Sequence, residues 1–241
     1  MKFQVIIPAR YASTRFPGKP LADLGGKPMV VRVCERAAKS GAAAVHVATD
    51  DERIARAVRA HGHQALMTRA DHASGTERVA EAAKFLHLKD REIVVNVQGD
   101  EPLISPRLIA KVGNLLQKCR DASVSTACHA IHDTDALSSP NVVKVVLDAR
   151  GYALYFSRSQ IPYPRASGAA CYRHAGIYGY RVAFLKKYSG LKASPLEKTE
   201  ALEQLRVLWH GYRIAVAISR TRIAPGVDTP EDLEAVRKML S

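Results

Sequence analysis

Short apolar runs alternate with segments of helical periodicity through the first half of this chain, and this alternation restricts its fold more than any other feature of the sequence. Residues 3–7 form an apolar run closed by Pro8, and residues 28–39 then carry apolar side chains at helical spacing. Expected strands at 44–48, 64–67 and 93–97 alternate in the same way with expected helices at 52–61, 75–88 and 106–118. Because strands connected through helices usually pair in parallel, the sequence predicts an α/β fold with a mostly parallel, Rossmann-like sheet and flanking helices.

The second half of the chain departs from this alternation after residue 120. Three strands are expected in succession, and the turn residues 148–151 predict a hairpin between the last two. The expected elements of this half are strands at 123–130, 142–147, 152–156, 173–180 and 213–218, a loop at 161–171, and helices at 195–209 and 230–240. No linker or repeat divides the sequence, so we expect one domain over residues 1–241, with residues 121–190 as an inserted antiparallel region.

The chain is basic, with 36 Lys and Arg against 23 Asp and Glu and a formal net charge of +13. Such a charge favours an anionic partner, and a nucleic-acid-binding module is one hypothesis. The excess is spread evenly, with 20 basic and 12 acidic side chains in residues 1–120 and 16 and 11 in the rest, so the sequence has no basic tail. Aromatic residues do not interleave with the basic ones either. An enzyme of small polyanions such as nucleoside triphosphates fits this distribution, and a solvated basic surface without a role is the alternative.

Apolar runs and cysteine spacing indicate the compartment. No run approaches the roughly 18 residues that cross a bilayer, and the first apolar segment is too short for a secretory signal, so we expect a cytoplasmic protein without a membrane partner. Cys34, Cys119, Cys128 and Cys171 form neither a C-x-x-C pair nor a zinc-ligand pattern. We therefore expect four reduced thiols.

The loop after the first expected strand carries the densest set of phosphate-binding groups. Arg10, Arg15 and Lys19 supply three cations within ten residues, and Ser13 and Gly18 stand between them. Arginine pairs with phosphate through two donors, lysine acts as a point charge, and glycine lets backbone amides approach phosphate oxygens. The loop lacks the P-loop pattern, so ordinary NTPase chemistry is not implied. A solvated basic loop is the alternative.

Two aspartates stand where a nucleotide-bound Mg²⁺ needs ligands. Asp100 follows the strand expected at 93–97, beside a glycine, and Asp228 precedes the helix expected at 230–240. Carboxylates are ligands that Mg²⁺ takes together with phosphates. The alternative for Asp100 is a local turn, and for Asp228 a capping turn in which Thr229 is the N-cap and Pro230 the first helical residue.

Further polar residues are ambiguous when taken singly. Residues 74–77 have the form of a capping box, in which Ser74 begins a helix, and Arg78 follows with either a structural or a ligand-binding role. The other candidates are polar side chains on expected strands or helix surfaces, each equally explained as an ordinary structural residue: Gln98, Arg158, His174, Tyr178, Glu203 and Gln204.

Taken together and in order, these segments resemble one enzyme family, the 3-deoxy-manno-octulosonate (Kdo) cytidylyltransferases, or CMP-Kdo synthetases. The motifs are RYASTRFPGKP (10–20), ATD (48–50), TRADHASGTER (68–78), NVQGDEP (96–102), YFSR (155–158), GIYGY (176–180), LEQLR (202–206) and GVDTPED (226–232). Each motif is weak alone, but the ordered set runs from end to end of the chain. It also separates the chain from the related CMP-sialic acid synthetases, whose sugar-side motifs differ.

The resemblance implies a fold of the nucleotide-diphospho-sugar transferase type and attack of the Kdo 2-hydroxyl on the α-phosphate of CTP. The products are CMP-Kdo, for lipopolysaccharide biosynthesis, and pyrophosphate. It also implies Mg²⁺ as cofactor and a homodimer formed through residues 121–190, with no specific nucleic-acid partner. The implied roles are catalysis by Arg10, Lys19, Asp100 and Asp228; metal binding by Asp100 and Asp228; CTP binding by Arg10, Ser13, Arg15, Lys19, Ser74 and Arg78; and sugar binding by Gln98, Arg158, His174, Tyr178, Glu203 and Gln204.

Two features depart from the family pattern. The loop at 162–172 is shorter than the family leads us to expect, and the net charge of +13 is higher. Two other hypotheses remain open at this point: a cytidylyltransferase for a related 2-keto sugar acid, such as 8-amino-Kdo or a sialic acid, and the nucleic-acid-binding module.

Overall fold

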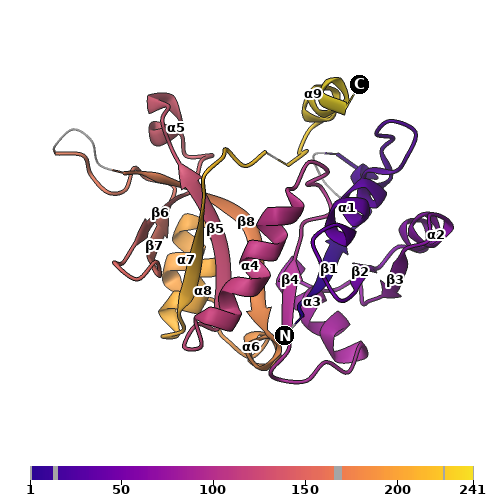
Figure 1. Cartoon of the computed structure of the whole chain (residues 1–241), viewed down its shortest axis with the longest axis horizontal. Helices are drawn as coiled ribbons and strands as arrows, with labels where there is room; N and C mark the ends of the chain where they lie inside the picture. The colour runs from indigo at the N-terminus through magenta and orange to yellow at the C-terminus, as the bar shows by residue number, and fades with distance from the viewer. Residues whose placement is uncertain (1, 13–15, 166–169, 225, 241) are drawn as a thin grey trace.

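Strands from both halves of the chain join in one sheet. The structure is a computed structural model that describes residues 2–12, 16–165, 170–224 and 226–240, and within these residues the sheet has nine strands. They are β1 (Gln4–Ala9), β2 (Val45–Thr49), β3 (Gln64–Met67), β4 (Ile93–Asn96), β5 (Val124–Ala130), β6 (Lys144–Leu147), β7 (Ala153–Ser157), β8 (Tyr172–Arg181) and β9 (Ile214–Ser219). Figure 1 shows β3 at one side of the molecule and the β6–β7 hairpin at the other.

The main path through the sheet has the order β3-β2-β1-β4-β8-β5-β9. Along it, β1, β2, β3 and β4 pair in parallel, and β5 pairs in parallel with β9. Strand β8 runs antiparallel to both of its neighbours on this path, and β6 continues the sheet from β8 into the hairpin with β7. The predicted fold class, a mostly parallel Rossmann-like sheet with flanking helices, is confirmed.

Helices cover both faces of the sheet. They are α1 (Met29–Ala38), α2 (Glu52–Ala60), α3 (Gly75–Phe85), α4 (Pro106–Lys118), α5 (Thr134–Ser138), α6 (Val182–Tyr188), α7 (Pro195–Glu200), α8 (Gln204–Trp209) and α9 (Pro230–Leu240), with a 3-10 turn, η1 (Lys19–Leu21). Buried side chains of α1, α2 and α4 form one apolar cluster, and those of α3, α6 and α8 form another on the opposite face. Helix α9 packs separately near the start of α1, where Leu233 and Val236 meet Leu24 and Met29 (Figure 1).

The structure differs from the sequence prediction at three helices. The helix expected at 195–209 is wrong as a single element, because Ala201 adopts a left-handed conformation (φ 51°) that ends α7. This break lets Leu202 enter the apolar core. Helices α5 and α6 were not predicted: α5 has only five residues, and α6 follows β8 directly, so its apolar pattern merges with that of the strand.

The loop after β4 packs closely against β1. Gly99 packs so tightly that a Cβ there would lie 3.0 Å from the carbonyl oxygen of Pro8, so the loop after β4 needs glycine at this point.

None of the helices in the described part of the chain combines the length and apolar character that crossing a bilayer requires. All four cysteines are free thiols, as expected.

Candidate functional site

The loops after β1 and β4, together with the start of α3, enclose a cavity that we call the main cavity because predicted site residues line it. This cavity has a volume of about 450 Å³ and lies at the carboxyl ends of two neighbouring parallel strands, where ligands of open α/β sheets collect. Its lining consists of Pro8, Ala9, Arg10, Ala12, Lys19, Pro20, Gly75, Arg78, Gln98, Gly99 and Asp100. Five of the predicted site residues are among them. Ser13 and Arg15, also predicted for this loop, lie outside the described residues.

Lys19 connects the two aspartates that were predicted as metal ligands. Its Nζ donates to Asp100 Oδ2 at 2.5 Å and to Asp228 Oδ1 at 3.4 Å, and it also donates to the carbonyl oxygen of Val227 at 2.9 Å. The Lys19 side chain is 12% exposed, against 31% for Asp100 and 50% for Asp228. Two carboxylates from opposite halves of the chain therefore converge on one cation at the edge of the main cavity.

Backbone contacts bring Asp228 to this position. The Val227 N–H donates to the carbonyl oxygen of Asp100 at 2.8 Å, and a Cβ on Gly226 would lie 3.3 Å from the same oxygen. The turn before α9 is held by other groups: Thr229 Oγ1 accepts from the Asp232 N–H, and the Asp232 carboxylate accepts from the Asp228 and Thr229 N–H groups. The predicted N-cap at Thr229 is present, and the Asp228 carboxylate faces Lys19.

Arg78 is the most buried cation at the main cavity, with 1% of its side chain exposed. Its Nη2 donates to Asp50 Oδ2 at 2.8 Å, and its Nη1 donates to Thr68 Oγ1 at 2.6 Å. Asp50 and Thr68 follow β2 and β3, so two loops at one edge of the sheet fix the guanidinium of this α3 residue. Both residues stand in quoted motifs, 48–50 and 68–78, but no role was predicted for them, because an aspartate or a threonine after a strand carries no specific signal.

The predicted capping box at the start of α3 is only half formed. Ser74 Oγ accepts from the Glu77 N–H at 3.3 Å, as an N-cap does. The Glu77 carboxylate accepts from the Ala73 N–H at 2.9 Å, one residue before the reciprocal bond of a capping box. Gly75, which follows Ser74, lines the main cavity.

Four of the predicted sugar-binding residues gather on the α8 side of the sheet. Tyr178, Glu203 and Gln204 line one small cavity, where the Tyr188 hydroxyl donates to Glu203 Oε1 at 2.5 Å. The His174 ring lies with its centroid 5.5 Å from that of Tyr178. Because His174 and Tyr178 stand on β8, which borders β4, this group lies on the strand next to the one that leads to Gln98 and Asp100.

Burial keeps the ring side chains of this group uncharged. It lowers the pKa of His174 to about 3, so the imidazole is neutral, and its Nε2 lies 2.9 Å from Thr126 Oγ1. Burial, with the nearby Tyr180 and Glu203, raises the pKa of Tyr178 well above its usual value. The pKa of Glu101, beside Asp100, is raised to about 8 by burial and by the Asp100 charge. Neutral hydrogen-bonding groups of this kind suit the hydroxyl groups of a ligand.

Arg158 lies at the end of β7 and is held by backbone groups. Its guanidinium donates to the carbonyl oxygens of Glu200 at 2.7 Å and Pro140 at 2.9 Å, and its own N–H donates to the Glu200 carboxylate at 2.9 Å. Lys144, fully buried and not noticed in the sequence, donates to the carbonyl oxygens of Val142 and Arg158. In this structure Arg158 therefore joins the hairpin to α7.

Comparisons with known proteins show the family to which the chain is similar. The family model for Cytidylyltransferase matches residues 4–214. The 3-deoxy-manno-octulosonate cytidylyltransferase of Leptothrix cholodnii is 58% identical over 99% of this chain and 91% of its own length. That of Acidovorax ebreus is 56% identical over 99% of this chain and 97% of its own length.

Two solved structures are also similar. A CMP:2-keto-3-deoxy-manno-octonic acid synthetase complexed with CTP superposes with a TM-score of 0.94 at 46% identity, covering 100% of this chain and 98% of the other. A cytidylyltransferase from Leptospira borgpetersenii serovar Hardjo-bovis reaches a TM-score of 0.62 at 18% identity, over 98% of this chain and 85% of its own, which shows a shared fold alone.

Proposed function

This chain belongs to the cytidylyltransferase family, and on that premise we propose that it transfers CMP from CTP to the 2-hydroxyl of Kdo and releases pyrophosphate. It is a nucleotidyltransferase, and the family recognised from the ordered motifs is confirmed by relatives that match nearly the whole chain. The observation that carries the proposal is the convergence of Lys19, Asp100 and Asp228 at the edge of the main cavity. CMP-Kdo made in this way serves lipopolysaccharide biosynthesis.

The main cavity is the proposed CTP site. Arg10 and Lys19 line it and, with Arg15 of the same loop, would offset the charge of the triphosphate, to which Ser13 would donate a hydrogen bond. Arg78 lies beside Gly75 at the other side of the cavity, where its guanidinium is held by Asp50 and would position the cytosine base together with the start of α3. Rigid positioning of the triphosphate supplies much of the rate enhancement in phosphoryl-type transfer.

Asp100 and Asp228 are the proposed ligands for Mg²⁺. Their carboxylate oxygens both lie within 3.4 Å of the Lys19 ammonium, so they converge on one point that accepts a cation. The described residues contain no group of three or more His, Cys, Asp or Glu that could hold a metal, and two carboxylates plus substrate phosphates are a usual Mg²⁺ ligand set. The residues therefore fit the ion, which when bound would stabilise the charge of the reacting phosphate and of the pyrophosphate.

The α8 side of the sheet is the proposed sugar site, with Gln98 at the border to the main cavity. His174, Tyr178, Glu203 and Gln204 would bind the hydroxyl groups of Kdo, because they are hydrogen-bonding groups held by packing. Arg158, just after β7, belongs to the same proposal as a cation for the sugar carboxylate. In this arrangement the 2-hydroxyl of the sugar would face the α-phosphate of CTP between Gln98 and Lys19.

A homodimer formed through residues 121–190 is part of the proposal. Tyr152, just before β7, forms a single bridge to Ala215 of β9, but residues 153–157 of β7 pair with β6 alone among the described strands. Unpaired strand edges of this kind are commonly covered. Leu154 on β7 is 61% exposed and Tyr163 beyond it is 82% exposed. An isologous contact between two hairpins would cover both the edge and these side chains.

We also propose a cytoplasmic location, a reducing compartment of the kind that keeps thiols free.

The experiment that tests the function is a panel of sugar acids with CTP and MgCl₂, scored by pyrophosphate release. We expect Kdo to be the preferred substrate over 8-amino-Kdo and sialic acid. Lys19→Ala should abolish release, whereas Lys27→Ala, which removes a lysine that is 41% exposed, should not. Good turnover of an analogue without turnover of Kdo would overturn the assignment. Tight nucleic-acid binding that CTP does not displace, without pyrophosphate release, would favour the nucleic-acid-binding module.

A further inference from the structure

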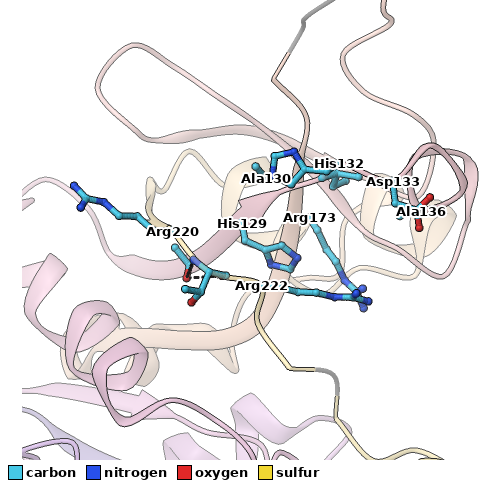
Figure 2. Close-up of a pocket in the computed structure, with 11 residues that line it drawn as sticks. His129, Ala130, His132, Asp133, Ala136, Arg173, Arg220 and Arg222 are labelled. Carbon is cyan, nitrogen blue, oxygen red and sulfur yellow. Dashed lines mark hydrogen bonds between the residues drawn. The ribbon is translucent and has the colours of Figure 1, made fainter.

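A second pocket lies where β5 and β9 end and β8 begins, and we refer to it as the arginine pocket (Figure 2). It has a volume of about 230 Å³ and is lined by His129, Ala130, Ile131, His132, Asp133, Ala136, Arg173, Ser219, Arg220, Thr221 and Arg222. None of these residues lines the main cavity. Neither the motifs nor the proposed reaction uses this pocket.

The arginine pocket is on the opposite face of the sheet from the proposed sugar site. Arg173 pairs across the sheet with His129, and His129 pairs with Ser219, so these three side chains share one face. His174, the next residue on β8, packs on the other face, where its ring meets Phe156 and Tyr178. The pocket and the sugar site are therefore separated by the thickness of β8.

Two guanidinium groups converge in the arginine pocket without a carboxylate partner. Figure 2 shows the side chains of Arg173 and Arg222 ending side by side, whereas Arg220 points away. Burial first, and then the nearby Arg222 charge, lowers the pKa of Arg173, so the two cations are close enough to repel each other. Within the described residues, none of the side chains of Arg173, Arg220 and Arg222 takes part in an ion pair or a hydrogen bond, and none belongs to the residues with a further contact. Arg173 is half-buried and Arg222 is exposed. Two like charges held close together without a partner are unfavourable, and this indicates that an anion completes the pocket.

His129 adds an unsatisfied polar atom to the same place. Its side chain is 7% exposed, and its Nδ1 has no hydrogen-bond partner in the described part of the chain. Burial first, and then the charges of Arg173, Arg222 and His132, lower the pKa of His129. The one acidic residue of the lining, Asp133, is exposed and accepts from the Asp135 N–H at 3.0 Å as the cap of α5. A buried ring nitrogen, which donates when it carries the imidazole proton, is thus available for a ligand atom.

From this geometry we propose that the arginine pocket binds a phosphate group, as inorganic phosphate or as part of pyrophosphate, outside the catalytic centre. Two guanidinium forks match the oxygens of a phosphate, and His129 supplies a further hydrogen bond. The volume is below the roughly 300 to 1,000 Å³ of pockets for drug-sized ligands, so a small anion fits better than a nucleotide. Arg222 belongs to the segment that leads from β9 to Asp228, and a bound phosphate would attach this segment to β8.

The test is calorimetric titration of the full chain with inorganic phosphate and, separately, with pyrophosphate. Mg²⁺ is omitted, and NaCl keeps the ionic strength constant. The test variant is Arg222→Ala, which removes one of the converging cations. The matched control is Arg220→Ala, which removes the same charge from the same segment, at a side chain that points away from Arg173 and Arg222. Both are made in a Lys19→Ala background, which weakens binding at the main cavity.

We expect the Lys19→Ala protein to bind at least one of the two anions, Arg222→Ala to weaken this binding about tenfold or more, and Arg220→Ala to change it by less than about threefold. The nitrogen chemical shifts of the His129 ring should move on titration in the control and not in Arg222→Ala. Tighter binding of pyrophosphate than of phosphate would identify a diphosphate as the occupant.

Each of three results would overturn the proposal. In one, neither anion binds once Lys19 is replaced, which would assign all phosphate binding to the main cavity. In another, Arg222→Ala and Arg220→Ala titrate alike, which would reduce the arginines to a diffuse positive surface. Binding of duplex DNA that requires Arg222, without binding of either small anion, would likewise replace the phosphate site with a nucleic-acid surface. Because the readout is binding, these results do not depend on the proposed transfer reaction.

Discussion

Replacement of Asp50 by asparagine removes the negative charge that neutralises Arg78, a buried cation of the main cavity. The two side chains are 2.8 Å apart, and they are 16% and 1% exposed. The neighbouring residue, Asp51, offers a matched control. It pairs with Arg53 at 2.6 Å and has the same 16% exposure, but Arg53 is 52% exposed. The two pairs therefore differ mainly in how far water reaches the cation.

The expected costs follow from this difference in exposure. At an effective dielectric constant of about 20, two unit charges about 4 Å apart attract by about 4 kcal/mol, and removal of one partner from a buried pair costs about 3 to 5 kcal/mol. An asparagine at position 50 still accepts one hydrogen bond, so we expect Asp50→Asn to lower the free energy of unfolding by about 3 kcal/mol. Asp51→Asn should lower it by less than about 1 kcal/mol, because surface pairs contribute little and asparagine also caps α2.

Urea unfolding followed by circular dichroism measures both effects. With a slope of about 3 kcal/mol per molar urea, the loss in Asp50→Asn moves the midpoint by about 1 M. The double variant Asp50→Asn/Arg78→Met should be more stable than Asp50→Asn alone, because it leaves no uncompensated buried charge. Equal midpoints for Asp50→Asn and Asp51→Asn would refute the reasoning, since exposure would then not determine the strength of these pairs.

Three further predictions concern the proposed site and the assembly. Asp100→Asn and Asp228→Asn should keep the far-UV circular dichroism of the wild type but lose on the order of 100-fold in turnover; near-normal turnover of Asp228→Asn at low Mg²⁺ would leave that residue only a role in the turn before α9. Burial lowers the pKa of His174 from 6.5 to about 3. On acidification His174 is therefore protonated in the unfolded chain before it is protonated in the folded chain, and the free energy of unfolding falls as the pH drops below about 6.5. Urea unfolding should show the wild type losing as much as about 2 kcal/mol more than His174→Gln between about pH 7.5 and about pH 5, and equal losses would contradict this. Light scattering should give about twice 26.3 kDa for the wild type, and Leu154→Glu should lower this mass, whereas a fully active wild-type monomer would exclude the dimer.

Local patterns were sufficient for most elements of this fold. The strands and helices up to residue 118 were predicted within a few residues, because alternating burial and helix caps depend on near neighbours in the sequence. The helix expected at 195–209 was wrong for the complementary reason. Its break at Ala201 is stabilised by contacts that are distant in sequence, such as the burial of Leu202 and the bonds of Glu200 to Ser157 and Arg158.

The functional groups divide in the same way. Arg10, Lys19, Asp100 and Asp228 were each found from the sequence, because a loop that follows a strand and carries charged residues is a local signal and because the motifs stand in a known order. Their convergence is a tertiary property: Lys19 and the two aspartates meet only because parallel β1 and β4 are neighbours and the Val227 N–H binds the Asp100 carbonyl oxygen.

The partners of Arg78 and the whole arginine pocket came from the tertiary structure alone. Asp50 and Thr68 reach Arg78 from two other loops, and Arg173, His129 and Arg222 come from β8, β5 and the segment after β9. Asp50 and Thr68 stand in two of the quoted motifs, but no spacing in the sequence links them to Arg78 or links the residues of the arginine pocket to one another. Whether such a charge is paired or isolated depends on which strands pair and on how far water reaches the site, and the sheet topology decides both.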